Sequence, residues 1–87
     1  MDESTEKLAK AISAAATRLD FQIDYPKILL IATDVKENLK HIPLNQKLDA
    51  IKNGSLAKYG RVYKLSAHEI FYWIREHKKE INPKQSY

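Results

Sequence analysis

Three basic side chains within one short stretch are the residues of this chain best suited to bind a ligand. Lys58, Arg61 and Lys64 recur every three positions, and Tyr59 and Tyr63 stand between them. Basic side chains pair with phosphates, while tyrosines stack on bases or bond phosphate oxygens. The pattern therefore predicts a loop that contacts the backbone of a nucleic acid through Lys58, Tyr59, Arg61 and Lys64.

A structural interpretation of the same stretch stays open. Tyr59, Val62, Tyr63 and Leu65 could hold the loop against a core, which would leave the basic residues merely solvated. A phosphate-cradling loop of the nucleotide-binding type is excluded, because the stretch lacks the glycine-lysine-serine/threonine ending that precedes a helix in such loops.

The residues around Pro43 outline a helix-turn-helix. A helix ending near Ile42 is followed by a turn and then by a short helix from Asn45. The side chains expected on the outer face of this short helix are Asn45, Gln46, Lys47, Asp49, Lys52 and Asn53. Because asparagine, glutamine and lysine read base edges in the major groove, four of them are candidate DNA contacts: Asn45, Gln46, Lys47 and Lys52. The alternative is an ordinary helical corner with a polar face.

The last predicted helix begins at a capping box and carries an aromatic cluster. Ser66 and Glu69 have the spacing at which the two side chains satisfy free amides at a helix start. The apolar stripe that follows consists of Ile70, Trp73, Ile74, His77 and Ile81. Phe71 and Tyr72 lie beside this stripe, so an exposed aromatic there would indicate a protein partner or a homodimer contact. Complete burial of this helix in the core is the alternative.

No catalytic constellation is recognisable. The histidines are His41, His68 and His77, and the last two are nine positions apart, which places them on opposite sides of one helix. The sequence has no two-histidine metal motif and no serine or cysteine in a nucleophile elbow. We therefore expect no enzyme activity, no metal, no cofactor and no small-molecule substrate.

Four helices are expected to position these residues. Their predicted ranges are about 4–18, capped by Ser4 or Thr5, then 26–41, 44–53 and 66–81. Gly54 is expected to end the third helix by supplying the left-handed backbone conformation. Residues 19–25 alternate like a strand, but the sequence offers no convincing partner strand. We therefore favour an extended connector that tucks Phe21, Ile23 and Tyr25 against the core over a true strand.

The fold class that follows is all-α. Residues 1–87 are expected to form one compact four-helix domain with a long ordered loop, rich in glycine and tyrosine, before the last helix. Short connections favour antiparallel neighbours. The tail from 82 to 87 is expected to fray.

Composition limits the class of protein further. The chain has no cysteine, which excludes a disulfide framework and thiolate zinc sites and fits a reducing compartment. Its start is acidic and polar, unlike a signal peptide, and its longest apolar run is Ile28–Ala32, so we expect a cytoplasmic protein without a membrane span. Residues 1–24 carry five acids and three bases, whereas residues 25–87 carry six acids and twelve bases. This asymmetry permits, but does not require, a polyanionic partner.

Residues 50–74 resemble a pattern of small helical proteins encoded by bacterial phages and mobile elements. The resemblance rests on Ala50–Ser55, Tyr59–Ser66 and Ile70–Ile74: a helix that ends in glycine, a tyrosine-glycine loop, and a final helix with a tryptophan. It implies a phage-related or DNA-related context and assigns no residue a role.

Together these patterns favour a small non-enzymatic DNA-associated protein that contacts the nucleic-acid backbone through its basic loop. The alternative is an adaptor or homodimeric accessory protein that uses the aromatic final helix.

Overall fold

The computed structural model describes residues 2–81, which form four helices and, within that range, no strand. The helices are α1 (Glu3–Arg18), α2 (Tyr25–Asn38), α3 (Leu44–Ser55) and α4 (Ala67–Ile81). The prediction of an all-α four-helix fold is confirmed. The predicted fraying of the tail concerns residues 82–87, which lie outside the described part.

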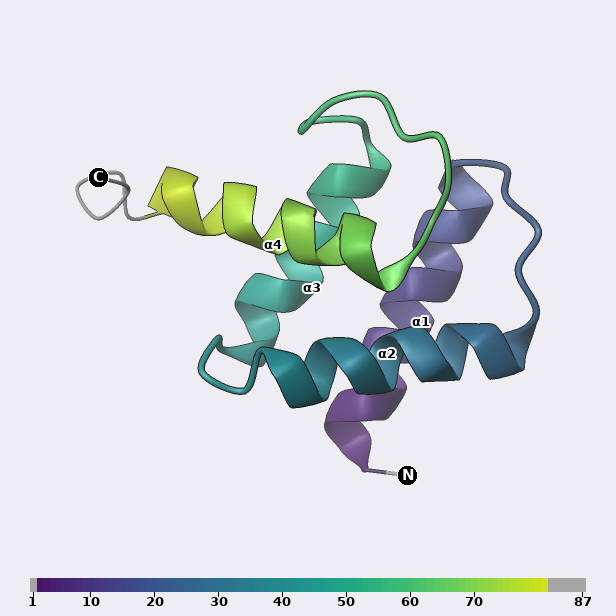
Figure 1. The fold of residues 1–87 in the computed structure, drawn as a ribbon, viewed down its shortest axis with the longest axis horizontal. Helices are drawn as coiled ribbons and strands as arrows, with labels where there is room; N and C mark the ends of the chain where they lie inside the picture. Colours follow the sequence, from purple (N-terminus) through teal and green to yellow (C-terminus); the bar gives the residue numbers. More distant parts are fainter. Residues whose placement is uncertain (1, 82–87) are drawn as a thin grey trace.

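The helices form two crossed pairs. α2 and α4 lie across the front of the view in Figure 1, with α1 and α3 behind them. α1 packs on α2 and α3, and α4 packs on α3 and α2. The packed consecutive helices, α1 with α2 and α3 with α4, cross instead of running antiparallel (Figure 1), the arrangement that short connections would favour. The connectors 19–24, 39–43 and 56–66 are long enough to turn the chain between layers.

One apolar core joins all four helices. The largest fully buried side chains are Trp73, Leu8, Ile12, Ile51, Ile70, Ile74 and Val35. Apolar residues three and four positions apart place one side of each helix in this core, as the sequence periodicity predicts. Leu65 of the last connector is also buried, so the loop before α4 is pinned at its end.

Two helix starts show how local sequence fixes the boundaries. The carboxylate of Asp2 accepts a hydrogen bond of 2.7 Å from the amide of Thr5 and caps α1, so the expectation that Ser4 or Thr5 would be the cap is wrong. Thr5 is instead buried inside the first turn. The Ser66 hydroxyl accepts from the amide of Glu69 at 3.3 Å, which is the serine half of the predicted capping box.

The connector between α1 and α2 turns at Leu19 and Asp20, and as expected it forms no strand. Phe21 and Ile23 pack partly buried against the core. Tyr25 does not, because it is the first residue of α2 and its side chain is 55% exposed. α2 ends at Asn38, three residues before the expected His41, because the chain turns at Leu39 and buries Ile42.

α1 and α3 both end in a Schellman motif whose left-handed residue is not glycine. Asp20 (φ 60°) follows α1, and Ala57 (φ 62°) follows α3. After α3 the amide of Lys58 donates to the carbonyl of Asn53 at 3.1 Å, and that of Ala57 donates to Gly54 at 3.0 Å. The predicted left-handed role of Gly54 is therefore wrong, since Gly54 lies within the helix. Trp73 packs on its Cα, where any side chain would collide with the indole ring.

The left-handed alanine gives a stability prediction. We expect Ala57→Gly to raise the free energy of unfolding by about 0.5–1 kcal/mol, because an alanine Cβ is crowded in this conformation and a glycine is not. Urea denaturation monitored by circular dichroism would measure the change. Ala14→Gly, at a half-buried position inside α1, should lower stability by about as much. Loss of stability in both variants would contradict the left-handed assignment of Ala57.

Within residues 2–81, no helix combines the length and the apolar character that crossing a membrane requires.

Candidate nucleic-acid interface

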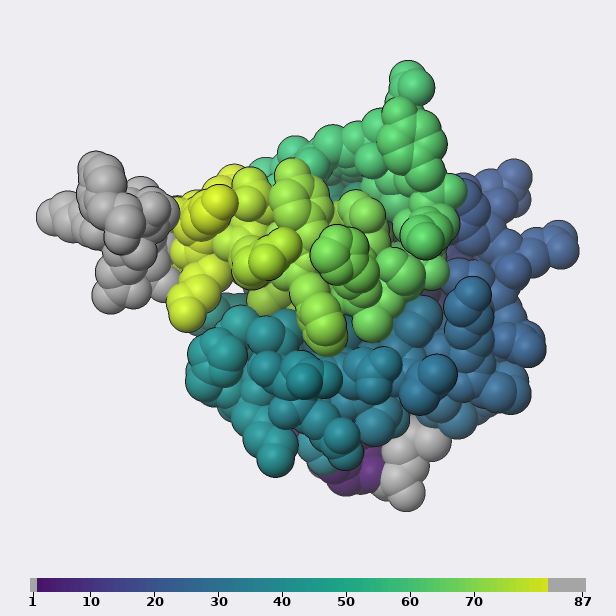
Figure 2. Space-filling view, viewed as in Figure 1, coloured from purple at the N-terminus to yellow at the C-terminus, as the bar shows by residue number. Residues whose placement is uncertain are grey.

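The connector 56–66, here called the basic loop, contains Lys58, Arg61 and Lys64 and no acidic residue. It leaves the end of α3, passes over one edge of the molecule and enters α4 (Figure 1). In the space-filling view this loop forms a protrusion beyond the packed helices (Figure 2). A projecting segment with three positive charges is accessible to a polyanion.

Tyr59 anchors the first half of the basic loop to α4. Its hydroxyl lies 3.1 Å from Nδ1 of His77 and 3.5 Å from Nδ2 of Asn53. Its backbone carbonyl accepts a 3.1 Å hydrogen bond from the Tyr72 hydroxyl. Burial raises the pKa of the Tyr59 phenol above its ordinary value. The ring and hydroxyl of Tyr59 are thus engaged inside the protein, and the predicted nucleic-acid contact by this residue loses its support.

Lys58 is also engaged with α4. Its ammonium lies 3.2 Å from the carboxylate of Glu80, and both side chains are about half exposed. The hydrogen bond from Lys58 is the main cause that lowers the pKa of Glu80. Exposed ion pairs of this kind contribute little free energy, so Lys58 can exchange Glu80 for a phosphate at small cost.

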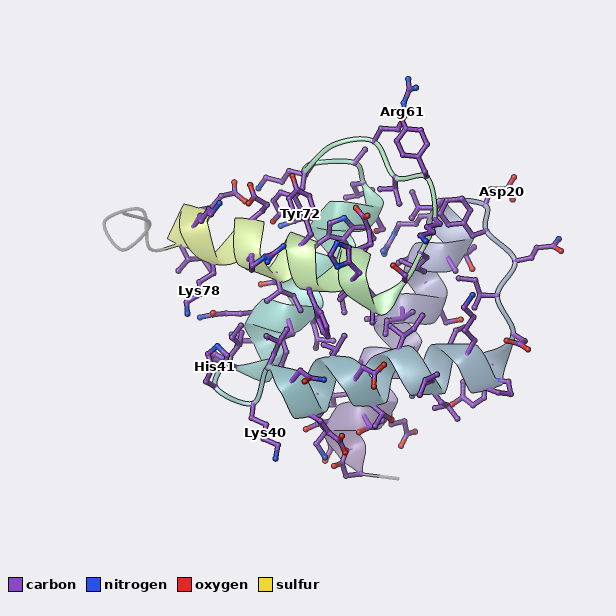
Figure 3. The ribbon with its side chains drawn as sticks, in the orientation of Figure 1. Asp20, Lys40, His41, Arg61, Tyr72 and Lys78 are labelled. Atoms are coloured by element: carbon purple, nitrogen blue, oxygen red, sulfur yellow. The ribbon has the colours of Figure 1, made fainter. Side chains whose placement is uncertain are left out.

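The second half of the basic loop faces solvent. Arg61 and Lys64 are exposed, and Tyr63 between them is 79% exposed. Arg61 projects away from the helices at the tip of the loop (Figure 3). The alternative in which Tyr63 holds the loop to the core is therefore wrong. Val62, half-buried, and Leu65, buried, do hold it, as that alternative states.

The helix-turn-helix residues are divided between the two ends of α3. Asn45 is exposed and Gln46 is half-buried near the start of α3, at the end of the helix opposite the basic loop (Figure 1). Lys52 is exposed in the last turn, beside the loop. Asn45 and Gln46 therefore do not form one surface with Arg61.

Lys47 does not face outward as predicted. Its side chain is only 5% exposed, and its ammonium donates a 3.1 Å hydrogen bond to the carbonyl of Leu39 at the end of α2. Burial, and secondly the charge of Lys36, lower the pKa of Lys47. Lys47 lies in the first turn of α3, and the turn 39–43 brings the carbonyl of Leu39 within reach of its ammonium.

The two candidate protein-contact aromatics are half-buried. Phe71 and Tyr72 both pack against the core from α4. Tyr72 lies on the near side of α4 in Figure 3, and its hydroxyl is the donor to Tyr59. The hydrogen bond to Tyr59 thus explains the position of Tyr72 without a protein partner.

Arg18 is a further cation at this edge that the sequence does not indicate. It ends α1, and its guanidinium donates a 3.0 Å hydrogen bond to the hydroxyl of Ser55, the last residue of α3. Arg18 and Ser55 are 37 positions apart, so only the packing of α1 on α3 brings this charge to the base of the loop.

The comparisons with known proteins gave no match to a family model, to a curated protein or to a solved structure. The resemblance of residues 50–74 to phage and mobile-element proteins therefore stays a prediction.

Proposed function

We propose that this protein is a small non-enzymatic DNA-associated protein whose basic loop contacts the nucleic-acid backbone. The observation that supports this proposal best is the exposure of Tyr63 between two exposed cations, Arg61 and Lys64. Core packing does not require any of these three side chains. Arginine and lysine neutralise phosphates, and a free tyrosine ring is a stacking surface for a base.

The exposed ring favours single-stranded over duplex DNA. In a duplex the faces of the bases are covered by their neighbours in the stack, so a tyrosine ring can reach only phosphates and groove edges. In a single strand each base offers a free face. The mechanism would be phosphate contact by Arg61 and Lys64, with Lys58 and Arg18 adding charge at the base of the loop, and stacking on Tyr63.

Fluorescence anisotropy with dye-labelled single strands and duplexes tests this proposal. We expect the logarithm of affinity to fall linearly with that of salt concentration between about 50 and 200 mM. Arg61→Ala with Lys64→Ala should reduce the salt slope by about 1–2, and Tyr63→Ala should weaken single-strand binding by about 1–3 kcal/mol.

Tyr25→Ala is the matched control, because Tyr25 is an exposed tyrosine on α2, outside the basic loop. The Tyr25→Ala variant should bind single-stranded DNA with the affinity of the wild type. Absence of binding to any strand at the lowest salt concentration would remove the proposed function. Equal losses in Tyr63→Ala and Tyr25→Ala would remove the stacking role alone.

A protein-binding role for α4 is the alternative proposal, and it now depends on Phe71, since Tyr72 has a partner inside the chain. Sedimentation velocity distinguishes the two: concentration-dependent association that Phe71→Ser abolishes, without DNA binding, would favour the adaptor.

A further inference from the structure

A second basic site is lined by the start of α1, the end of α2, the turn that follows it and the start of α3. A cleft of about 300 Å³ is lined there by Ser4, Lys36, Lys40, Ile42, Pro43, Leu44 and Lys47. Three of these seven side chains are lysines and none is acidic. Figure 3 shows Lys40 projecting from the turn after α2, next to His41. Asn45 and Gln46, which adjoin this cleft in sequence, belong to the end of α3 that the basic loop does not reach.

The cleft contains an unusual buried cation. Lys47 is the one charged side chain that is buried within residues 2–81. An ammonium has three N–H donors, and the Leu39 carbonyl accepts one of them. Among the described residues no carboxylate forms an ion pair with Lys47. A buried ammonium without an anionic partner is costly, so the site is expected to attract an anion.

The charge around Lys47 is also unbalanced. Lys36 pairs with the carboxylate of Asp2, whose other oxygen caps α1. Even with Asp2 counted, Lys36, Lys40 and Lys47 leave two positive charges in excess at the cleft. Because Lys36, Lys40 and Lys47 all line the same cleft, their charges can act on one ligand.

We propose that this cleft binds a phosphate dianion, either free or as the phosphomonoester of a small molecule. Lys40 and Lys47 would donate charge-assisted hydrogen bonds to the phosphate oxygens, and Lys36 would add charge from the rim. The hydroxyl of Ser4 is a further donor at the edge of the cleft. The apolar wall of Ile42, Pro43 and Leu44 would face the organic part of an ester.

A structural role of Lys47 alone does not explain the other lysines. The positive charge of Lys47 at the end of α2 stabilises the negative end of the helix dipole. That role needs only Lys47, and it gives no reason for Lys40 to stand on the same cleft. Lys40 is exposed and forms no ion pair with another residue of the range 2–81. The two interpretations differ in whether Lys40 changes the response to phosphate.

Thermal unfolding with millimolar phosphate, against chloride at equal ionic strength, tests the site. Phosphate should raise the melting temperature of the wild type in a saturable way, since a ligand of the folded state stabilises it by mass action. Lys40→Ala should weaken the apparent affinity about fivefold, and Lys47→Met about tenfold or more. Lys64→Ala, in the basic loop, is the matched control and should respond like the wild type.

Amide chemical shifts during a phosphate titration give a second measurement that does not depend on stability. Shifts should be largest at residues 40–47 and absent from 56–66. Methyl phosphate and dimethyl phosphate separate the ligand classes: the monoester dianion should bind like free phosphate or better, and the diester monoanion at least about tenfold more weakly. Equal binding of the diester, an unsaturable response, or an unchanged response in Lys40→Ala would overturn the proposal.

Discussion

Gly54→Ala should lower the free energy of unfolding by about 3 kcal/mol or more, the largest effect that we expect from any single methyl group in this chain. A Cβ at Gly54 would lie only 2.0–2.4 Å from the Cδ2, Cε2 and Cε3 atoms of Trp73, much closer than van der Waals contact allows. Trp73 is fully buried, so its ring can move away only by displacing other core atoms. Overpacking of this kind typically costs about 1–3 kcal/mol and sometimes more.

Helix propensity acts in the opposite direction and is too small to compensate. Replacing glycine by alanine inside a helix gains about 1 kcal/mol where the side chain has room. The steric cost therefore decides the sign at Gly54. A domain of this size has a total stability of roughly 5–10 kcal/mol, so the variant should melt well below the wild type.

A double variant separates this collision from a general defect of α3. Trp73→Leu makes room for the new methyl group, so Gly54→Ala should cost much less in that background, and the coupling energy should reach about 1–3 kcal/mol. Gly60→Ala is the glycine control. It meets no neighbouring atom, and its cost of about 1–2 kcal/mol comes from its φ of 116° alone. A Gly54→Ala variant as stable as the wild type would show that Trp73 does not pack on Gly54.

Tyr59→Ala should have the second largest effect among these predictions. It should lower the free energy of unfolding by about 2 kcal/mol and make the basic loop more mobile. Tyr59 is half-buried against the core, so truncation removes ring contacts as well as the hydroxyl bonds to His77 and Asn53. Tyr59→Phe keeps the ring and should cost about 1 kcal/mol, the typical contribution of one hydrogen bond. Chemical denaturation gives these values.

Hydrogen exchange in residues 56–66 distinguishes anchoring from general destabilisation. Tyr59→Ala should accelerate exchange in the loop more than in α1 and α2, because only the loop loses an attachment. Tyr72→Phe, which removes the donor to the Tyr59 carbonyl, should accelerate the same amides by a smaller factor. Uniform acceleration across the chain would contradict an anchoring role of Tyr59.

Tyr59→Ala also tests the proposed DNA contact. If Arg61, Tyr63 and Lys64 act from a held loop, Tyr59→Ala should weaken binding although Tyr59 is not among these proposed contacts. The reason is that an ordered loop loses less conformational freedom on binding than a mobile one.

Several features could be predicted from local sequence because neighbouring residues cause them. The positions of the four helices follow from apolar spacing, and Ser66 begins α4 because its hydroxyl reaches the amide of Glu69. The burial of Trp73 follows from the same periodicity. These are contacts within one turn or one helical face, where 3.6 residues per turn leaves few alternatives.

The sequence by itself thus determined an all-α chain, a basic loop and the core face of each helix. The tertiary structure decided which polar residues remain free: it engaged Tyr59 with His77, buried Lys47 under the end of α2, placed Arg18 beside Ser55 and left Tyr63 exposed. It also shows why position 54 requires a glycine: Trp73 packs against Gly54, and a left-handed backbone conformation is not involved. Each of these outcomes depends on which helix packs on which. Helical periodicity predicts which face of a helix is buried, but it does not predict which other helix covers that face.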